Sequence, residues 1–323
     1  MTPVELSRTV LHAVRCAVDQ GELAVTVPER VQVTPPGPGG CGDYATNVAL
    51  QLARPAGQPP LRVAEILRPH LATLDGVDDV VVTGPGFLNI SLRPDVDPTA
   101  DLVREIRHRG PAYGHGDALA GQVVTLRVPY DVRAEVVADA LVRIVATQGG
   151  RAEVEHAEPV NLRPVPAPED PAPLGPDAAQ WALLHPAAHD RPRITADHLV
   201  QREANPLFRV RYAHARTRAL TRNAARLGFT AEPCAVGNPE LVGALADHPR
   251  ILAAAAIHRA PDRLARHLVT VADAALPFLL TVLPRGDEKP SAAHRARLAL
   301  AEAAGTVLAG GLSLLGIDAP DHL

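Results

Sequence analysis

Seven prolines within 18 residues, from Pro159 to Pro176, constrain the fold of this 323-residue chain more than any other feature. Proline lacks a backbone N–H and fixes φ, so neither a helix nor a central strand can run through such a segment. The chain must therefore be divided here. The spacing favours polyproline II and predicts a semi-rigid, extended linker between the two flanking parts of the chain.

The part after the prolines is predicted to be helical. Apolar residues recur there every three or four positions, which is the periodicity of an amphipathic helix, with few β-branched stretches between them. The pattern predicts a helical bundle in residues 177–323, with helices in five stretches: 177–184, 206–227, 240–257, 261–283 and 292–316.

The first 112 residues are predicted to form an α+β module. Helices are expected at about 4–20 and 60–74, and an extended apolar piece at 23–33. A third helix is expected within 43–53, with Asp43 as its N-cap. Two strands around a Gly-Pro-Gly turn at 84–86 complete the module.

Residues 113–176 look like a reduced α/β segment. A strand in 121–131, a helix in 134–150 and a strand in 152–158 make one βαβ unit, and the proline-rich stretch comes after it. The expected fold class is therefore a multi-domain α+β protein. Its three parts are the α+β module (1–112), a βαβ remnant with a linker (113–176) and an all-α bundle (177–323).

Several classes of protein are disfavoured by composition. No apolar run is long enough to span a membrane, and the first 23 residues resemble an amphipathic helix rather than a signal peptide, so a cytoplasmic location is expected. Cys16, Cys41 and Cys234 are isolated, which predicts neither a zinc site nor a disulfide framework. The glycine-rich loop at 37–42 lacks the Lys-Ser/Thr of a P-loop. No cofactor and no metal are expected.

Arginine is concentrated at the start of the helical part. Residues 202–226 hold seven arginines against the single acid Glu203, in a chain of net charge −4. On a helix, Arg211, Arg218 and Arg222 lie opposite an apolar stripe. Two interpretations stay open. The stripe is either a solvated face that keeps the bundle soluble or a surface that contacts phosphate groups of a nucleic acid.

Longer motifs resemble those of arginyl-tRNA synthetases. "GDYATNVALQLA" and "GPGFLNI" are similar to motifs of that family's N-terminal additional domain. "NPLFRVRYAHAR" and "HRARLALAEAAGTVLAGGLSLLGIDAP" resemble its C-terminal DALR anticodon-binding domain. The matches occur in family order along almost the whole chain. The resemblance implies that 1–112 is the additional domain, 113–176 a degenerate Rossmann remnant, and 177–323 the anticodon-binding bundle.

The resemblance also indicates which motifs the chain lacks. It aligns Arg133 with an arginine that follows the family's His-x-Gly-His tetrad, so that residues 128–131, "VPYD", occupy the tetrad's place. Asp131 there would repel a triphosphate. Lys289 is the only lysine, and no Lys-Met-Ser-Lys-Ser-like loop exists. We therefore expect a pseudoenzyme of class I arginine–tRNA ligase descent rather than an enzyme.

Two groups of RNA-binding residues are implied by the resemblance. Phe87 and Asn89 correspond to an aromatic residue and an asparagine that hold an exposed D-loop base. In the alternative interpretation, Phe87 is a core residue and Asn89 forms a turn. Tyr212, His214 and Arg216 belong to the anticodon side. For His214 the alternative is a hydrogen-bonded packing histidine. Backbone phosphates are assigned to Arg209, Arg211, Arg218 and Arg222.

The preferred hypothesis is a non-catalytic, RNA-binding protein that holds a tRNA(Arg)-like molecule at its D-loop and anticodon arms. It would present charged tRNA to a partner enzyme, or compete for that tRNA. One alternative is a protein-interaction scaffold that no longer binds tRNA. A third is residual arginine–tRNA ligase activity together with a partner. Binding to tRNA should be salt-sensitive under the first hypothesis.

Overall fold

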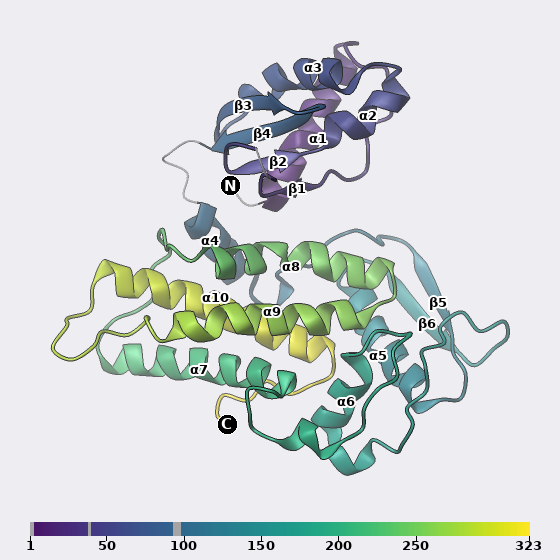
Figure 1. Ribbon diagram of the computed structural model, residues 1–323, viewed down its shortest axis with the longest axis vertical. Helices are drawn as coiled ribbons and strands as arrows, with labels where there is room; N and C mark the ends of the chain where they lie inside the picture. Colours follow the sequence, from purple (N-terminus) through teal and green to yellow (C-terminus); the bar gives the residue numbers. More distant parts are fainter. Residues whose placement is uncertain (1–2, 38–39, 93–97) are drawn as a thin grey trace. The chain divides into compact units, whose positions relative to one another are not determined.

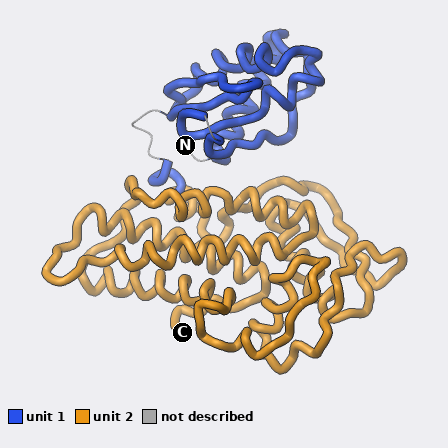
Figure 2. The backbone as a smooth tube through the Cα atoms, in the orientation of Figure 1, with its two compact units in different colours: residues 1–102 blue, residues 103–323 orange. Residues whose placement is uncertain are grey.

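The computed structural model describes residues 3–37, 40–92 and 98–323 (Figure 1). Residues 38–39 of the glycine-rich loop lie outside the described part. The chain forms two compact units, residues 1–102 and 103–323 (Figure 2). The architecture is helix-rich α+β, as expected. The predicted division into 1–112, 113–176 and 177–323 stays a prediction.

Unit 1 is an antiparallel sheet covered by helices. Within residues 3–92 as far as they are described, the strands lie in the order β1 (Val33–Thr34), β2 (Tyr44–Thr46), β4 (Phe87–Leu92), β3 (Val77–Thr83). Helix α3 (Pro60–Ala72) contacts α1 (Pro3–Asp19) and α2 (Val48–Ala56), and each of the three contacts a strand of the sheet. Their apolar faces share one core with the strands, around Leu6, Leu67 and Ile90, all fully buried.

Asp43 does not cap a helix, contrary to expectation. Residues 44–46 form strand β2, and α2 begins at Val48 after Asn47. The Asp43 carboxylate instead accepts a hydrogen bond from the Leu92 backbone N–H (2.8 Å), and its own N–H donates to the Ile90 carbonyl (2.9 Å). Asp43 therefore ties β2 to β4, because an extended backbone leaves its side chain free to bind the neighbouring strand.

The boundary between the two units falls within α4 (Pro98–Arg109), and a 3-10 turn, η1 (Gly110–Ala112), follows this helix in unit 2. A βαβ unit comes next: β5 (Val123–Arg127) pairs in parallel with β6 (Arg151–Glu155), and α5 (Val132–Ala146) connects them. Four long helices make the bundle (Figure 1): α7 (Pro206–Arg226), α8 (Pro239–Ile257), α9 (Pro261–Leu279) and α10 (Ala292–Leu314). Helix α5 packs on α8, α9 and α10, so the βαβ unit and the bundle share a core.

The proline-rich segment is packed within unit 2, which corrects the expectation of an extended linker. Asn161 donates to the Thr125 carbonyl (3.0 Å) and accepts from the Arg127 N–H (2.8 Å), so it extends the edge of β5. Leu162 and Leu174 are buried. The prolines leave only a short 3-10 turn, η2 (Ala172–Leu174), in this segment. They did not prevent packing, because the N–H groups of Asn161 and Leu162 bind the Arg127 carbonyl on β5, and the Val165 N–H binds the Ala188 carbonyl in the loop after α6 (Pro176–Leu184).

The buried guanidinium of Arg133 joins this segment to α5 and α6. Arg133 is fully buried. It donates to five backbone carbonyls, at distances from 2.6 to 3.0 Å: Val165, Leu183, Pro186, Ala187 and Asp190. Burial lowers the pKa of Arg133, but a guanidinium stays charged at neutral pH. One side chain thus fixes the loop between α6 and η3 (Ala196–Leu199).

We expect Arg133→Met to destabilise unit 2 by about 3–5 kcal/mol, because it leaves buried carbonyls without a donor. Urea unfolding followed by the fluorescence of Trp181, the single tryptophan and fully buried in α6, measures this. Arg151→Met, at an exposed arginine on β6, is the control and should change stability by less than about 0.5 kcal/mol. Equal midpoints for the two variants would contradict the proposed role.

The close approach of α7 and α10 depends on a glycine. A Cβ at Gly305 in α10 would collide with Oγ1 of Thr217 in α7, whose hydroxyl donates to the His214 carbonyl (2.7 Å). Gly310, further along α10, has space: a Cβ there would meet only the Pro111 carbonyl oxygen, at 3.8 Å. The same helix therefore allows a crowded glycine, Gly305, to be compared with an open one, Gly310.

Gly305→Ala should destabilise unit 2 by about 1–2 kcal/mol, because overpacking outweighs the gain in helix propensity. Gly310→Ala should stabilise it by up to about 1 kcal/mol. The two variants differ only in position, so the sign of each change in urea midpoint is the readout. A stabilising Gly305→Ala would mean that α7 can move away from α10 at no cost.

Candidate nucleic-acid interface

The start of α7 is set by Asn205 and Pro206. The Asn205 carboxamide oxygen accepts from the Leu207 N–H (3.0 Å), and its amide nitrogen donates to the carbonyls of His198 (2.8 Å) and Val200 (3.0 Å). Proline at the first helical position costs no hydrogen bond. The Asn-Pro pair thus begins the helix and also attaches η3 to it.

The buried face of α7 fixes its rotation in the bundle. It packs on α9 and α10. Its buried residues include Val210, Ala213, His214, Thr217, Leu220 and Ala224. The side chains between these positions therefore face outward, and they include the aromatic and arginine residues singled out by the sequence.

Two aromatic rings and a guanidinium stack along the outer face of α7. The rings of Phe208 and Tyr212 lie 5.4 Å apart at 16°, and the Arg216 guanidinium carbon lies 6.0 Å from the centre of the Tyr212 ring. The spacing of four residues places all three on one face. We call these residues the α7 stack. The Arg216 side chain makes no hydrogen bond or ion pair with any described residue, so its charge is available to a ligand.

Arg209 and Arg211 are paired with acids from other helices. Arg209 lies 2.9 Å from Asp273 of α9, and Arg211 lies 3.3 Å from Asp177 of α6. Their Nε atoms are buried without a partner in the described structure. These two arginines hold helices together within unit 2, and neither is a free cation.

Arg218 and Arg222 bind the segment after α10. Arg218 donates to the Asp321 carboxylate (2.9 Å), and Arg222 donates to the Asp321 backbone carbonyl (3.3 Å). The hydrogen bond from Arg218 holds the pKa of Asp321 below its usual value. The expected stripe of free guanidinium groups is therefore partly occupied by the chain itself, because its acidic partners lie far away in sequence.

His214 packs inside unit 2. It is buried, and its Nδ1 donates to the Pro320 carbonyl oxygen (3.1 Å). Burial lowers its pKa, so the ring is neutral at pH 7. The packing alternative describes this histidine better than the role of base reader.

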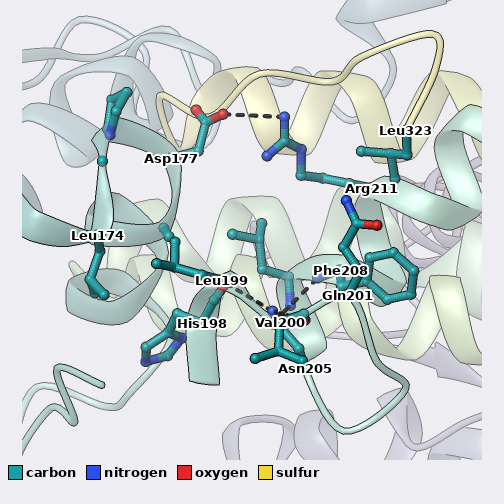
Figure 3. A pocket seen from close by; sticks show the side chains of 14 residues that line it. Leu174, Asp177, His198, Leu199, Val200, Gln201, Asn205, Phe208, Arg211 and Leu323 are labelled. Carbon is teal, nitrogen blue, oxygen red and sulfur yellow. Dashed lines mark hydrogen bonds and ion pairs between the residues drawn. The ribbon is translucent and has the colours of Figure 1, made fainter. Parts of the chain in front are cut away.

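A cavity of about 240 Å³ opens beside the α7 stack (Figure 3). The Phe208 ring and the apolar side chains of Leu199 and Val200 line it, and the Arg211–Asp177 pair crosses one side. The Gln201 carboxamide adds a hydrogen-bonding group. Apolar walls with a few polar groups suit a small ligand that has an apolar body and polar edges.

Phe87 and Asn89 differ in accessibility within unit 1. Phe87, at the start of β4, is 40% exposed, whereas Asn89 is 2% exposed. The Asn89 amide donates to the Thr83 hydroxyl (2.5 Å) on β3. Asn89 thus supports the β3–β4 hairpin, and Phe87 is the residue that a ligand can reach.

The positions that the sequence assigned to the tetrad have structural roles. Asp131 is the N-cap of α5 and accepts from the Ala134 N–H (3.0 Å). Tyr130 is 87% exposed and stacks on His156, with ring centres 4.2 Å apart.

Membrane spans and metal sites can be assessed over the described residues only. No helix among them is long and apolar enough to cross a membrane. They also contain no cluster of three or more His, Cys, Asp or Glu side chains able to hold a metal ion. The expected cytoplasmic location stays a prediction.

Phe208 was missed by the sequence reasoning, although its spacing of four residues from Tyr212 and eight from Arg216 is visible. The sequence analysis assigned Tyr212 and Arg216 to the same site, and the structure places them side by side. It treated Arg209, Arg211, Arg218 and Arg222 alike, and it could not have identified the partners of each.

Curated relatives resemble parts of the chain. It is 46% identical over 129 residues to the arginine–tRNA ligase of Renibacterium salmoninarum, covering 39% of this chain and 23% of that protein. It is 39% identical over 159 residues to the arginine–tRNA ligase of Frankia alni, covering 46% and 28%. The chain thus spans about a quarter of the length of these relatives.

These relatives contradict the expectation that the chain is not an enzyme, because both are named as ligases, which are enzymes. The missing tetrad and lysine loop led to that expectation. Because the named relatives are enzymes, the pseudoenzyme interpretation is withdrawn.

Solved structures share the fold. Thermus thermophilus arginyl-tRNA synthetase superimposes with a TM-score of 0.66 at 14% identity, over 100% of both chains. Arginyl-tRNA synthetase from Plasmodium falciparum gives 0.64 at 8% identity, over 99% of both. At such identities the likeness concerns the fold alone.

Two family models match separate parts of the chain. Residues 7–92 match the arginyl tRNA synthetase N terminal domain, and residues 210–323 match the DALR anticodon binding domain. The first range holds Phe87, and the second begins inside α7 and includes Tyr212 and Arg216. The chain therefore contains an arginyl-tRNA synthetase-like N-terminal domain and a DALR anticodon-binding domain.

Proposed function

We propose that the chain binds tRNA, with the outer face of α7 as the principal contact. The observation that carries this is the α7 stack, whose Tyr212 and Arg216 lie within the segment similar to an anticodon-binding domain. The tRNA(Arg)-like identity of the ligand and a partner enzyme that uses it remain predictions.

Stacking is the chemistry that suits this face. Bases in an RNA loop are unpaired and can be splayed out, and an aromatic ring stacks on any of them. Phe208 and Tyr212 already form such a platform, and Arg216 extends it with a cation. The adjacent cavity of about 240 Å³ gives room for a base next to the platform.

The paired arginines are a second source of affinity. Arg218 and Asp321 are about half exposed, and an exposed ion pair contributes little to stability. A phosphate oxygen can replace the Asp321 carboxylate on Arg218 at small cost, because both present the same bidentate geometry to the guanidinium. The Asp321 carboxylate therefore does not prevent a phosphate from binding Arg218.

Phe87 of unit 1 is proposed as a separate stacking contact. Its exposed ring stands at the end of a hairpin that Asn89 stabilises from within. Under this proposal Asn89 positions the ring and does not itself read a base.

Fluorescence anisotropy with total tRNA and with an arginine isoacceptor tests the proposal. Arg216→Glu should weaken tRNA binding at least about tenfold, because it reverses the charge of an accessible cation. It should also reduce the slope of the logarithm of the binding constant against the logarithm of the salt concentration by about one. Tyr212→Ala should weaken it about 5- to 100-fold through lost stacking.

Arg151→Glu is the matched control, since it makes the same charge change on β6, away from α7. It should leave affinity within about twofold of the unmodified chain. Equal affinities for Arg216→Glu and Arg151→Glu would exclude the α7 stack. No complex with tRNA even at low salt would instead favour the protein-interaction scaffold.

Removing the acid that occupies Arg218 should have the opposite effect. Asp321→Asn frees the Arg218 guanidinium, and we expect tRNA binding to tighten about two- to fivefold at low salt, where phosphate contacts dominate. Asp318→Asn, which removes an equal charge three residues earlier, is the control. If Asp321→Asn weakens binding, the segment after α10 contributes to the RNA surface instead of competing for it.

A further inference from the structure

A second cavity, of about 360 Å³, lies in unit 2 between the end of α6, η3 and α9. Its walls are mainly basic or small: Ala182, His185, Pro186, Ala187, Asp190, Arg191, Arg193, His198 and Arg266. We call it the basic pocket. Three arginines and two histidines line it against one aspartate, in a chain that is acidic overall.

Two of its arginines have no partner among the described residues. The side chains of Arg191 and Arg193 are exposed and make no hydrogen bond or ion pair with any residue in the described ranges. Arg266 comes from the opposite wall, on α9, and pairs with Asp262. Arg209, Arg211 and Arg218 of α7, by contrast, are each paired with a carboxylate. Two guanidinium groups at one cavity without such a pair distinguish this place.

The backbone carbonyl groups of the pocket wall do not repel an anion in the pocket. The carbonyl oxygens of Pro186, Ala187 and Asp190 are bound to the buried Arg133 guanidinium, at 2.7 to 3.0 Å. These oxygens therefore point to Arg133 and not into the pocket. The charge of Arg133 also contributes a positive field from behind the wall, where little solvent screens it.

The two histidines supply hydrogen-bonding groups to the wall. His198 donates from Nε2 to the Arg193 carbonyl oxygen (2.8 Å), which holds the arginine loop against η3. Burial, and then the charges of Arg266, His198 and Arg209, lower the pKa of His185 to about 4. His185 is thus neutral at pH 7. The positive groups around it disfavour protonation of its ring.

We propose that the basic pocket binds a phosphate group. Guanidinium groups from two sides of a cavity match phosphate oxygens in geometry and in charge, and His185 can add one hydrogen bond. The pocket has room for more than one phosphate, so a diphosphate is the preferred small ligand. The group belongs either to a free phosphate compound or to an RNA backbone. This site is separate from the α7 stack and does not depend on tRNA binding.

Trp181 provides a direct readout, because its ring stacks on His185 with centres 5.0 Å apart. Inorganic pyrophosphate titrated at constant ionic strength should change the Trp181 fluorescence saturably, with a midpoint at or below about 1 mM, and raise the melting temperature. Sodium chloride at matched ionic strength should do neither. Arg191→Gln/Arg193→Gln should raise the midpoint at least tenfold.

Arg151→Gln/Arg163→Gln is the matched control, since it removes two exposed arginines outside the pocket and should leave the midpoint unchanged. Urea unfolding confirms that both double variants fold. No saturable response in the unmodified chain overturns the proposal. An unchanged midpoint in Arg191→Gln/Arg193→Gln overturns it as well.

Binding of tRNA distinguishes the two sources of phosphate. If pyrophosphate competes with tRNA, and Arg191→Gln/Arg193→Gln weakens the tRNA complex, the pocket holds an RNA phosphate. If pyrophosphate binds and tRNA affinity is the same in both double variants, the ligand is a free phosphate compound. Both results support a phosphate site, and pyrophosphate binding without any tRNA binding would refute only the proposed function.

Discussion

The fold of unit 2 depends on a buried positive charge that is held by backbone carbonyls. Placing a guanidinium in the interior costs several kcal/mol unless its donors are satisfied, and Arg133 satisfies them with five carbonyl oxygens. Those oxygens come from the proline-rich segment, from the end of α6 and from the loop after it. The cost of burial therefore forces two irregular segments into one arrangement. That arrangement places α6, whose Asp177 reaches Arg211, and it forms the wall of the basic pocket.

Periodicity was enough to predict the helices after residue 176, but it did not predict α4 or the strand β2. Every helix expected after residue 176 is present, because each amphipathic stretch has one apolar face and one partner surface in the bundle. Local chemistry was less reliable. Asp43 could cap a helix or bridge two strands, and pairing of β2 with β4 decided the outcome. The proline run excluded helices correctly but said nothing about packing, since packing depends on Arg133 and Asn161, which lie outside any periodic pattern.

The candidate interface was only partly predictable for a related reason. A helical stripe of arginines can be read from spacing, but the net charge that it offers depends on acids from elsewhere in the chain. Asp177, Asp273 and Asp321 lie 34 to 103 residues away from their partners, so no window of sequence contains both members of a pair. The accessible cation turned out to be Arg216, which stacks on Tyr212 instead of pairing with an acid.

The two cationic places on unit 2 are suited to different parts of a ligand. The α7 stack combines aromatic faces with one free guanidinium, and it favours a base, because stacking needs a flat surface and little charge. The basic pocket has no aromatic lining apart from its histidines, and its unpaired guanidinium groups favour a phosphate. His198 belongs to the walls of both cavities, and Asn205 binds its carbonyl at the start of α7. The same short turn, η3, therefore forms part of both walls.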